Sequence, residues 1–254
     1  MIRIERHTDP RYAPVAEIIL DRPEKRNALT PSMLTDLSAR ALELAANPTV
    51  RAILLRGEGA VFCSGFDLTL CKDNSDALAD MLRALSTAIR TLRRIDKPIV
   101  IAARGAAIAG GCALLGGADL VIADQECKLG YPVLRLGISP AVNAPSLMLA
   151  LGSRATRERL LDPQLIRGEE ALRIGLIDRM VDIPEDVVPR AQIEAVKLAE
   201  KPPQAFAATK KWLNEVDGSD RDTPFEMALA ASLALVGGDE ERQRLNAQFN
   251  PNRG

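Results

Sequence analysis

Aromatic and histidine side chains are scarce in this chain. Its 254 residues include one histidine, one tryptophan and two tyrosines, and aromatic residues make up only 3% of the total. Because His7 lies in an N-terminal strand-like stretch, we do not expect a serine–histidine or cysteine–histidine catalytic pair in the middle of the chain. Hydrophobic residues still account for 47%, so the core is predicted to consist mainly of Ala, Leu, Ile and Val.

An excess of charge of one sign and long apolar runs are also missing. Lys and Arg number 33 against 34 Asp and Glu, which gives a formal net charge of −1. Neither a dense basic tract nor an apolar run of about 18 residues is present. Residues 1–6 alternate like a strand and lack the apolar run of a signal peptide. We therefore expect no nucleic-acid partner, no membrane association and a cytoplasmic location.

Several chemical motifs are absent as well. The cysteines, Cys63, Cys71, Cys112 and Cys127, form no C-x-x-C pair, which is typical of a reduced cytosolic protein. The sequence has no cluster with metal-ligand spacing, so no metal site is expected. It also has neither a phosphate-binding P-loop nor a dinucleotide-binding G-x-G-x-x-G motif.

What the chain does contain is an alternation of strands and helices, which predicts an α/β fold. Strand-like apolar runs occur at 15–20, 52–55 and 99–103. Thr30 followed by Pro31 predicts the start of the first helix, since threonine caps helices and proline suits their first position. A second helix is predicted from apolar residues at helical spacing between 78 and 92.

The chain becomes mainly helical after residue 143. Only 176–181 resembles a strand there, and the helices are predicted at 147–151, 155–161, 169–174, 188–198, 204–216 and 224–236. The last two are separated by a loop at 217–220. The apolar residues of 224–236 lie on more than one face, which predicts a helix buried on both sides.

Two glycine-bearing segments, 62–68 and 109–112, each follow a strand-like run. Such turns can bring two backbone N–H groups to one point, as in an oxyanion hole that stabilises negative charge on a carbonyl oxygen. Gly110 and Gly111 also open a short helix, whose N-terminus favours an anion. Packing and helix capping are the alternative roles for a glycine pair in such a turn.

These segments occur in a recognisable order. Residues 20–29 (LDRPEKRNAL) precede them, and 118–123 (ADLVIA), 130–132 (GYP) and 136–138 (LGI) follow. In this order the chain resembles the crotonase (enoyl-CoA hydratase/isomerase) superfamily from about Ile18 to Val181. The resemblance implies a crotonase-like ββα spiral core over residues 1–200, with a C-terminal helical region at 201–254 that covers the active site and forms a trimer contact.

The resemblance also implies a ligand and an assembly. The ligand is an acyl-CoA thioester, a small molecule that acts as substrate rather than as a permanently bound cofactor. Its carbonyl oxygen is expected between the N–H groups of Phe66 and Gly110. The assembly is expected to be a homotrimer or a dimer of trimers.

The departures from the family pattern bear on the reaction. Hydratases of this family place glutamates at the positions of Ala113 and Val133, and some dienoyl isomerases place an aspartate at the position of Ala141. Hydration and double-bond migration need a proton donor and acceptor within about 3 Å of the reacting carbon. Because none of these three side chains can transfer a proton, we do not expect ordinary hydratase turnover.

Other residues are candidates for binding the ligand. Tyr131, Ser139 and Asn143 fall in the segment that lines the acyl site in the family, where each could orient a carboxylate or hydroxyl. Asp67 follows the first proposed donor, and its expected role is to cap the next turn. The candidates for contact with CoA are Lys25, Arg26, Ala28, Ser64 and Gly65, of which the basic pair suits phosphate.

Three functional hypotheses follow. The favoured one is an acyl-CoA enzyme that forms a thioester enolate without a side-chain base, as in decarboxylation of a malonyl-type CoA. The second is a hydratase, isomerase or thioester hydrolase in which Tyr131, Asp67 or Ser139 replaces the usual acid and base. The third is a non-catalytic acyl-CoA binding or shuttle protein.

Overall fold

A six-stranded sheet forms the centre of the computed structural model, which describes residues 1–72, 74 and 76–249. The strand order is β1-β2-β3-β4-β6-β8; β1 is antiparallel to β2 and the other pairs are parallel. The bounds are β1 Ile2–Arg6, β2 Val15–Leu20, β3 Ala52–Gly57, β4 Ile99–Ala103, β6 Leu120–Asp124 and β8 Arg179–Val181. The mixed α/β fold expected from the alternating pattern is therefore confirmed.

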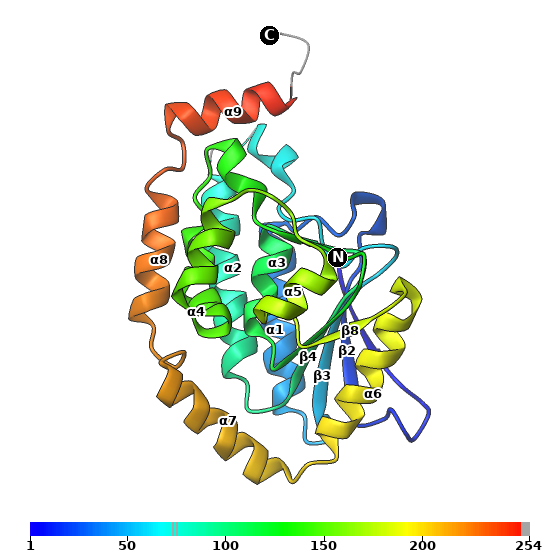
Figure 1. The fold of residues 1–254 in the computed structure, drawn as a ribbon. Helices are drawn as coiled ribbons and strands as arrows, with labels where there is room; N and C mark the ends of the chain where they lie inside the picture. Colours follow the sequence, from blue (N-terminus) through cyan, green and yellow to red (C-terminus); the bar gives the residue numbers. More distant parts are fainter. Residues whose placement is uncertain (73, 75, 250–254) are drawn as a thin grey trace.

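Helices cover both faces of this sheet, which explains why β2 and β4 are buried at every position. On one face α1 (Pro31–Ala46) and α2 (Ala77–Arg94) pack on side chains such as Ile18 and Ile53. On the other face α6 (Val187–Ala199) packs on the alternate residues, including Leu54 and Val100. Figure 1 shows α6 and α1 on opposite sides of the strands.

The first helix begins where the sequence predicts. Thr30 has extended backbone, and its Oγ1 accepts a hydrogen bond of 3.2 Å from the N–H of Met33, while Pro31 occupies the first helical position. This end fixes the direction in which α1 leaves the loop at residues 21–29.

A small second sheet carries both glycine-bearing segments. It consists of β5 (Ala106–Ile108) and β7 (Lys128–Gly130) in parallel, and Cys63 joins it through an isolated bridge to Ala107. The short helix α3 (Gly110–Leu114) follows β5 directly. The 3-10 helices of the described chain are η1 Pro23–Lys25, η2 Leu68–Lys72, η3 Leu115–Gly117, η4 Pro132–Leu136, η5 Pro140–Asn143 and η6 Pro184–Asp186.

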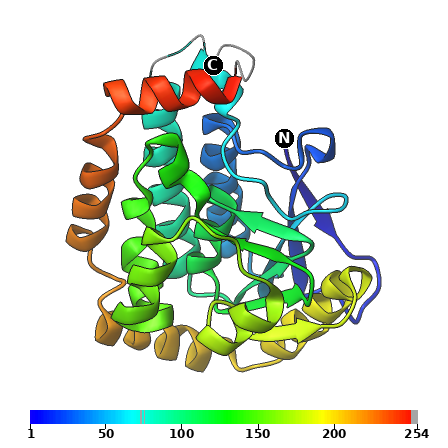
Figure 2. The same ribbon diagram turned by 45° about the horizontal axis from the view of Figure 1, so that its top comes forward.

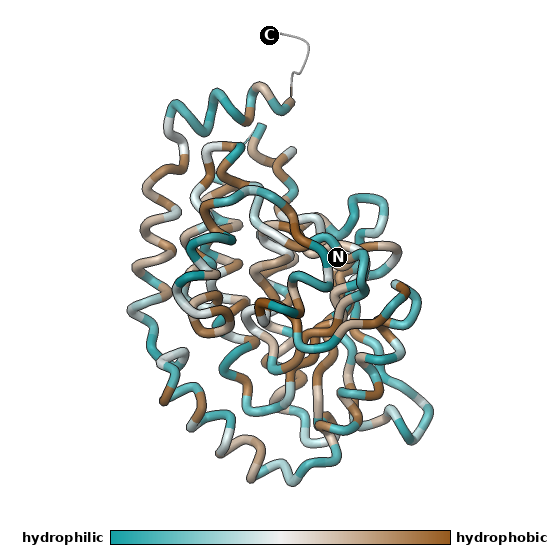
Figure 3. Tube along the Cα trace, viewed as in Figure 1, coloured by the Kyte–Doolittle hydropathy of each residue, from teal (hydrophilic) through white to brown (hydrophobic). Residues whose placement is uncertain are grey.

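The C-terminal half is helical, as expected, with one difference. The two helices predicted at 147–151 and 155–161 are present within α4 (Ala144–Leu161), on either side of Gly152, whose φ of 72° and ψ of 173° are not helical. After α5 (Gly168–Ile174), α7 (Pro203–Asp217) and α8 (Thr223–Leu233) comes a helix that the sequence reading missed, α9 (Asp239–Phe249). It lacks an apolar stripe, and Figure 3 shows it mostly hydrophilic.

Helix α9 lies across one end of the molecule (Figure 2). The Nζ of Lys72 lies 4.5 Å from the ring centroid of Phe249, and a Cβ on Gly137 would come within 2.9 Å of the Cα of Glu241. Thus α9 packs against both η2 and η4. The expected division at residue 200 stays a prediction, and the end of the C-terminal region, 250–254, lies outside the described residues.

The expectation for 224–236 is met on one face of α8 only. Phe225 is 3% exposed, whereas Met227 is 68% exposed in the single chain. Within residues 1–72, 74 and 76–249, the helices are too short or too polar to cross a membrane.

Candidate functional site

The two glycine-bearing segments run side by side. The N–H of Cys63 donates to the carbonyl of Ala106 at 3.0 Å, and the N–H of Ile108 donates to the carbonyl of Cys63 at 3.0 Å. A Cβ on Gly65 would lie 3.8 Å from the nitrogen of Gly110. The residues just beyond the ends of β3 and β5 therefore meet, as the sequence pattern suggested.

Unusual backbone conformations shape both turns. Gly65 has φ of 100°, a value that L side chains rarely adopt. Ala109 has φ of 51° and ψ of −115°, and its N–H donates to the carbonyl of Gly130 at 2.8 Å. Strain at a non-glycine residue of this kind persists only where the surroundings enforce it, and it is frequent at functional sites. Here it sets the direction in which Gly110 begins α3.

The position of the Phe66 N–H follows from its neighbours. Leu29 donates to the carbonyl of Gly65 and accepts from the N–H of Asp67, both at 2.8 Å. In such a parallel bridge the N–H of the intervening residue points away from the partner strand. A Cβ on Gly110 would lie only 3.0 Å from Cε1 of Phe66, so glycine at this position allows the two segments to pack closely.

Phe66 and Gly110 both line a cavity of about 120 Å³. Most of its wall is apolar and comes from η2, α2, β5, η4 and η5. Of the expected site residues, those lining it are Ser64, Phe66, Gly110, Val133, Ser139 and Asn143. Within the part of the chain that the structure describes, the only polar side chains on this wall are Ser64, Ser139 and Asn143, and none is an acid or base near neutral pH.

Three other expected acyl-pocket residues, Tyr131, Ala113 and Ala141, are not part of the cavity wall. The Tyr131 ring is 1% exposed and its hydroxyl meets the Cys112 thiol; burial raises the pKa of Tyr131 well above its usual value. Ala113 is also buried, in α3, and neither it nor Ala141 lines the cavity.

Asp67 is engaged in a structural ion pair. It accepts hydrogen bonds from Nη2 of Arg22 at 3.0 Å and from Oγ1 of Thr69 at 2.5 Å. Burial opposes ionisation, but these two donors hold the pKa of Asp67 below its ordinary value. The sequence reading missed Arg22, because a partner so distant along the chain leaves no local signal.

The candidate CoA-binding loop abuts the first glycine segment. Lys25 and Arg26 are exposed, and the carbonyl of Arg26 accepts from the N–H of Ser64 at 3.0 Å. Arg22 donates to the carbonyl of Ala28 at 2.7 Å. Asn27, fully buried, donates to the carbonyls of residues 58 and 61, each at 2.9 Å. The loop is thus a fixed wall beside the segment that carries Phe66.

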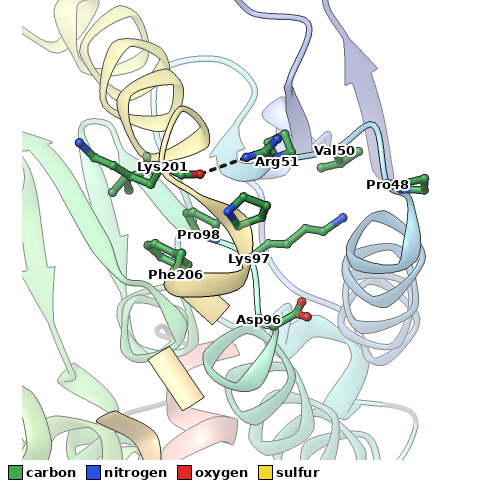
Figure 4. A pocket seen from close by; sticks show the side chains of 10 residues that line it. Pro48, Val50, Arg51, Asp96, Lys97, Pro98, Lys201 and Phe206 are labelled. Atoms are coloured by element: carbon green, nitrogen blue, oxygen red, sulfur yellow. Dashed lines mark hydrogen bonds between the residues drawn. The ribbon is translucent and has the colours of Figure 1, made fainter. Parts of the chain in front are cut away.

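A second cavity, of about 220 Å³, lies at the amino ends of the parallel strands (Figure 4). Two of its cations already have partners: Nζ of Lys97 donates to the carbonyls of Leu44 and Asn47 at the end of α1, and Arg51 donates to the carbonyl of Lys201 at 3.0 Å. In open α/β sheets ligands bind at the carboxyl ends of the strands. The first cavity is therefore the candidate site. Among the described residues no group of His, Cys, Asp or Glu is arranged to hold a metal ion.

The fold and these turns define a class of protein, and comparison with known families identifies it. The model of the enoyl-CoA hydratase/isomerase family matches residues 10–232. The chain therefore belongs to this family of enzymes, part of the crotonase superfamily.

Some of its relatives are similar over nearly their whole lengths. A protein of Thermus thermophilus that is named as an enoyl-CoA hydratase by assignment is 32% identical to this chain. The match covers 92% of this chain and 94% of the Thermus protein. The short-chain-enoyl-CoA hydratase of Clostridium acetobutylicum is 29% identical over 92% and 90%. The crystal structure of an enoyl-CoA hydratase/isomerase from Xanthobacter autotrophicus Py2 is 28% identical and superposes with a TM-score of 0.87, covering 98% of this chain and 93% of the other.

Proposed function

We propose that this protein binds an acyl-CoA thioester in the cavity bounded by Phe66 and Gly110. The thioester oxygen accepts hydrogen bonds from the two backbone N–H groups, which stabilise it as negative charge develops. The close approach of the two segments and the largely apolar wall support this assignment. Lys25 and Arg26, exposed on the adjoining loop, supply positive charge for the CoA phosphates.

The reaction we propose passes through a thioester enolate without a side-chain base. One observation carries it: among the described residues, none of the side chains on the cavity wall titrates near neutral pH. Decarboxylation of a malonyl-type thioester fits this chemistry. The bond from the carboxylate carbon to Cα breaks, its electron pair forms the enolate, CO₂ leaves, and Cα then takes a proton from water.

The same wall favours one alternative, a protein that holds an acyl-CoA without transforming it. A hydratase or hydrolase with relocated acid and base groups has less support. Tyr131 is buried against Cys112 and Asp67 is paired with Arg22, which leaves only Ser139 of those three candidates on the wall.

Mass spectrometry of the purified protein with a panel of acyl-CoAs separates these possibilities. The panel contains crotonyl-, malonyl-, methylmalonyl- and long-chain species, and both bound ligand and products are recorded. Loss of one CO₂ from a malonyl-type ligand supports the proposed reaction. Retention without turnover identifies the binding protein, and addition of water to crotonyl-CoA at about 10 per second or more contradicts the proposal.

Restoring carboxylates tests whether the cavity can still support hydration. We expect the double variant Ala113→Glu, Val133→Glu to gain measurable hydration of crotonyl-CoA, because Val133 lines the cavity and Ala113 lies in α3, three residues after Gly110. Arg135→Glu is the matched control, since it adds a glutamate to the same element, η4, at an exposed position. Equal rates in the control and the double variant would contradict the geometry.

We also propose that the protein assembles as a homotrimer or a dimer of trimers. The single chain exposes large apolar side chains on α7 and α8, including Trp212 at 63% and Met227 at 68%. Such a surface suits burial between subunits. Light scattering coupled to size-exclusion chromatography measures the assembly directly, and a monomer would overturn this assignment.

A further inference from the structure

Arg22 connects the loop at residues 22–29 to the segment that carries Phe66. Its Nη1 donates to the carbonyl of Ala28 at 2.7 Å, and its Nη2 donates to Oδ2 of Asp67 at 3.0 Å. Asp67 is buried, and 21% of the Arg22 side chain is exposed. A guanidinium can bridge two acceptors in this way because its N–H groups lie in one rigid plane. One side chain therefore ties the loop to the residue that directly follows Phe66.

The two acceptors of Arg22 flank the backbone bridge that orients the N–H of Phe66. Ala28 immediately precedes Leu29, and Leu29 forms an isolated parallel bridge with Phe66. On the opposite side of this bridge the N–H of Asp67 donates to the carbonyl of Leu29 at 2.8 Å. In such a bridge the N–H of Phe66 points away from Leu29. The direction of this N–H thus depends on how firmly the two backbones are held together.

The Asp67 carboxylate is held at both of its oxygens. Besides the bond from Arg22 to Oδ2, Oγ1 of Thr69 donates to Oδ1 at 2.5 Å. A carboxylate with a donor on each oxygen is restrained to one orientation. The backbone that follows Phe66 is therefore fixed by side-chain contacts as well as by the bridge to Leu29.

We infer that Arg22 is a positioning residue, which holds the N–H of Phe66 in the direction required to donate to a thioester oxygen. Neither Arg22 nor Asp67 lines the cavity, so the effect passes through the backbone on either side of Phe66. Donors of an oxyanion hole are effective because they are oriented before charge develops on the ligand. The inference rests on the proposed function, because a bound thioester must place its oxygen at this N–H.

Infrared difference spectroscopy with butyryl-CoA, isotopically labelled at the thioester carbonyl carbon, measures the hydrogen bonds to that oxygen. In the wild-type complex we expect the carbonyl stretch at a lower frequency than in water, because fixed donors polarise the C=O bond. This displacement should become smaller in Arg22→Gln. It should also become smaller in Arg22→Lys, because an ammonium is a point charge without the planar fork that reaches both acceptors. The lysine variant keeps the charge and covers the case that glutamine disturbs the fold.

Calorimetric titration of the same complexes gives the cost in affinity. We expect each Arg22 variant to bind butyryl-CoA about three- to tenfold more weakly than the wild type, which corresponds to the loss of one hydrogen bond. A general loosening of the protein would not lower the affinity and the carbonyl displacement together.

Arg93→Gln is the matched control. As Arg22 does, Arg93 donates to a carboxylate and to a backbone carbonyl, those of Asp217 at 2.7 Å and Ala118 at 3.4 Å. The exposed fraction of its side chain is 23%, close to that of Arg22. Because Arg93 does not line the cavity, its replacement removes a comparable ion pair but should leave the carbonyl frequency and the affinity unchanged.

The outcomes separate the two levels of the proposal. If butyryl-CoA does not bind the wild type, or binds without a lowered carbonyl frequency, the proposed oxyanion hole is wrong and the inference falls with it. If the wild-type frequency is lowered and the Arg22 variants keep it, the role of Arg22 is wrong and the proposed function stands. An equal loss in Arg93→Gln would likewise overturn the positioning role, because it would show that any ion pair of this kind has the same effect.

Discussion

Two buried regions of this protein differ in whether they contain ionisable side chains. Under α6, the fully buried Glu17 of β2 accepts hydrogen bonds from Arg56 at 2.5 Å, His7 at 2.8 Å and Gln192 at 2.7 Å. At the opposite face of the sheet the cavity wall has no ionisable side chain among the described residues. Its polar side chains, among those described, are two serines and one asparagine.

The difference indicates which groups could stabilise a charge on a ligand in the cavity. Burying Glu17 is tolerable because β3, α6 and the segment after β1 each supply a partner. No such set of partners surrounds the cavity, so a charge that develops on a bound ligand would be met by fixed peptide dipoles rather than by a mobile proton. This contrast favours an oxyanion-stabilising role over general acid–base chemistry.

The largest effect on stability is expected from removing the buried charge of Glu17. Glu17→Gln keeps the shape but removes the charge that faces Arg56 and His7, and we expect unfolding to become easier by about 3 kcal/mol. Urea denaturation measures it. Glu170→Gln is the control, because Glu170 pairs with Arg173 on the exposed surface, and little change is expected there. A similar loss in both variants would show that burial of the Glu17 cluster has no special weight.

The contribution of the Glu17 cluster to stability should depend on pH. Although burial opposes ionisation, the hydrogen bonds from Arg56 and Gln192 lower the pKa of Glu17 below its ordinary value of 4.5. A lowered pKa in the folded state contributes stability that is complete above 4.5 and lost as pH falls through the folded value. We therefore expect stability to fall more steeply below pH 4.5 in the wild type than in Glu17→Gln, as followed by urea midpoints. Parallel curves for the two proteins would contradict this.

Local signals in the sequence predicted local structure well. Thr30 and Pro31 predicted a helix start because their effects extend over one turn, and the structure confirms it. The glycines at 65 and 110 predicted sharp turns that come together, because glycine is needed where backbones approach closely. The α/β class could also be predicted from the sequence, because the periodicities of strands and helices are local.

Contacts between distant residues could not be predicted in this way. Arg22 meets Asp67, and Ser232 meets Val142, across separations that leave no pattern in the sequence. Helix α9 was missed because its residues are mostly polar, and its position depends on packing against η2 and η4.

The smallest effect on stability is expected from replacing Ser232, which supports the cavity wall. A second buried serine, Ser86, serves for comparison. Ser232→Ala leaves the N–H of Val142 without its acceptor, so we expect a loss of about 1–2 kcal/mol in unfolding free energy. Ser86→Ala is the matched control. Ser86 lies in α2 with 2% exposure, and its hydroxyl has no partner among the described residues, so its removal should cost little.

Ligand binding separates a local from a general effect of the serine change. Because Ser232 holds η5, which lines the cavity, Ser232→Ala should also weaken the binding of an acyl-CoA, whereas Ser86→Ala should leave that binding unchanged. Urea denaturation and calorimetric titration of the two variants measure both quantities. If Ser232→Ala loses stability while acyl-CoA binding is unaffected, η5 does not need α8 to keep its place in the cavity wall.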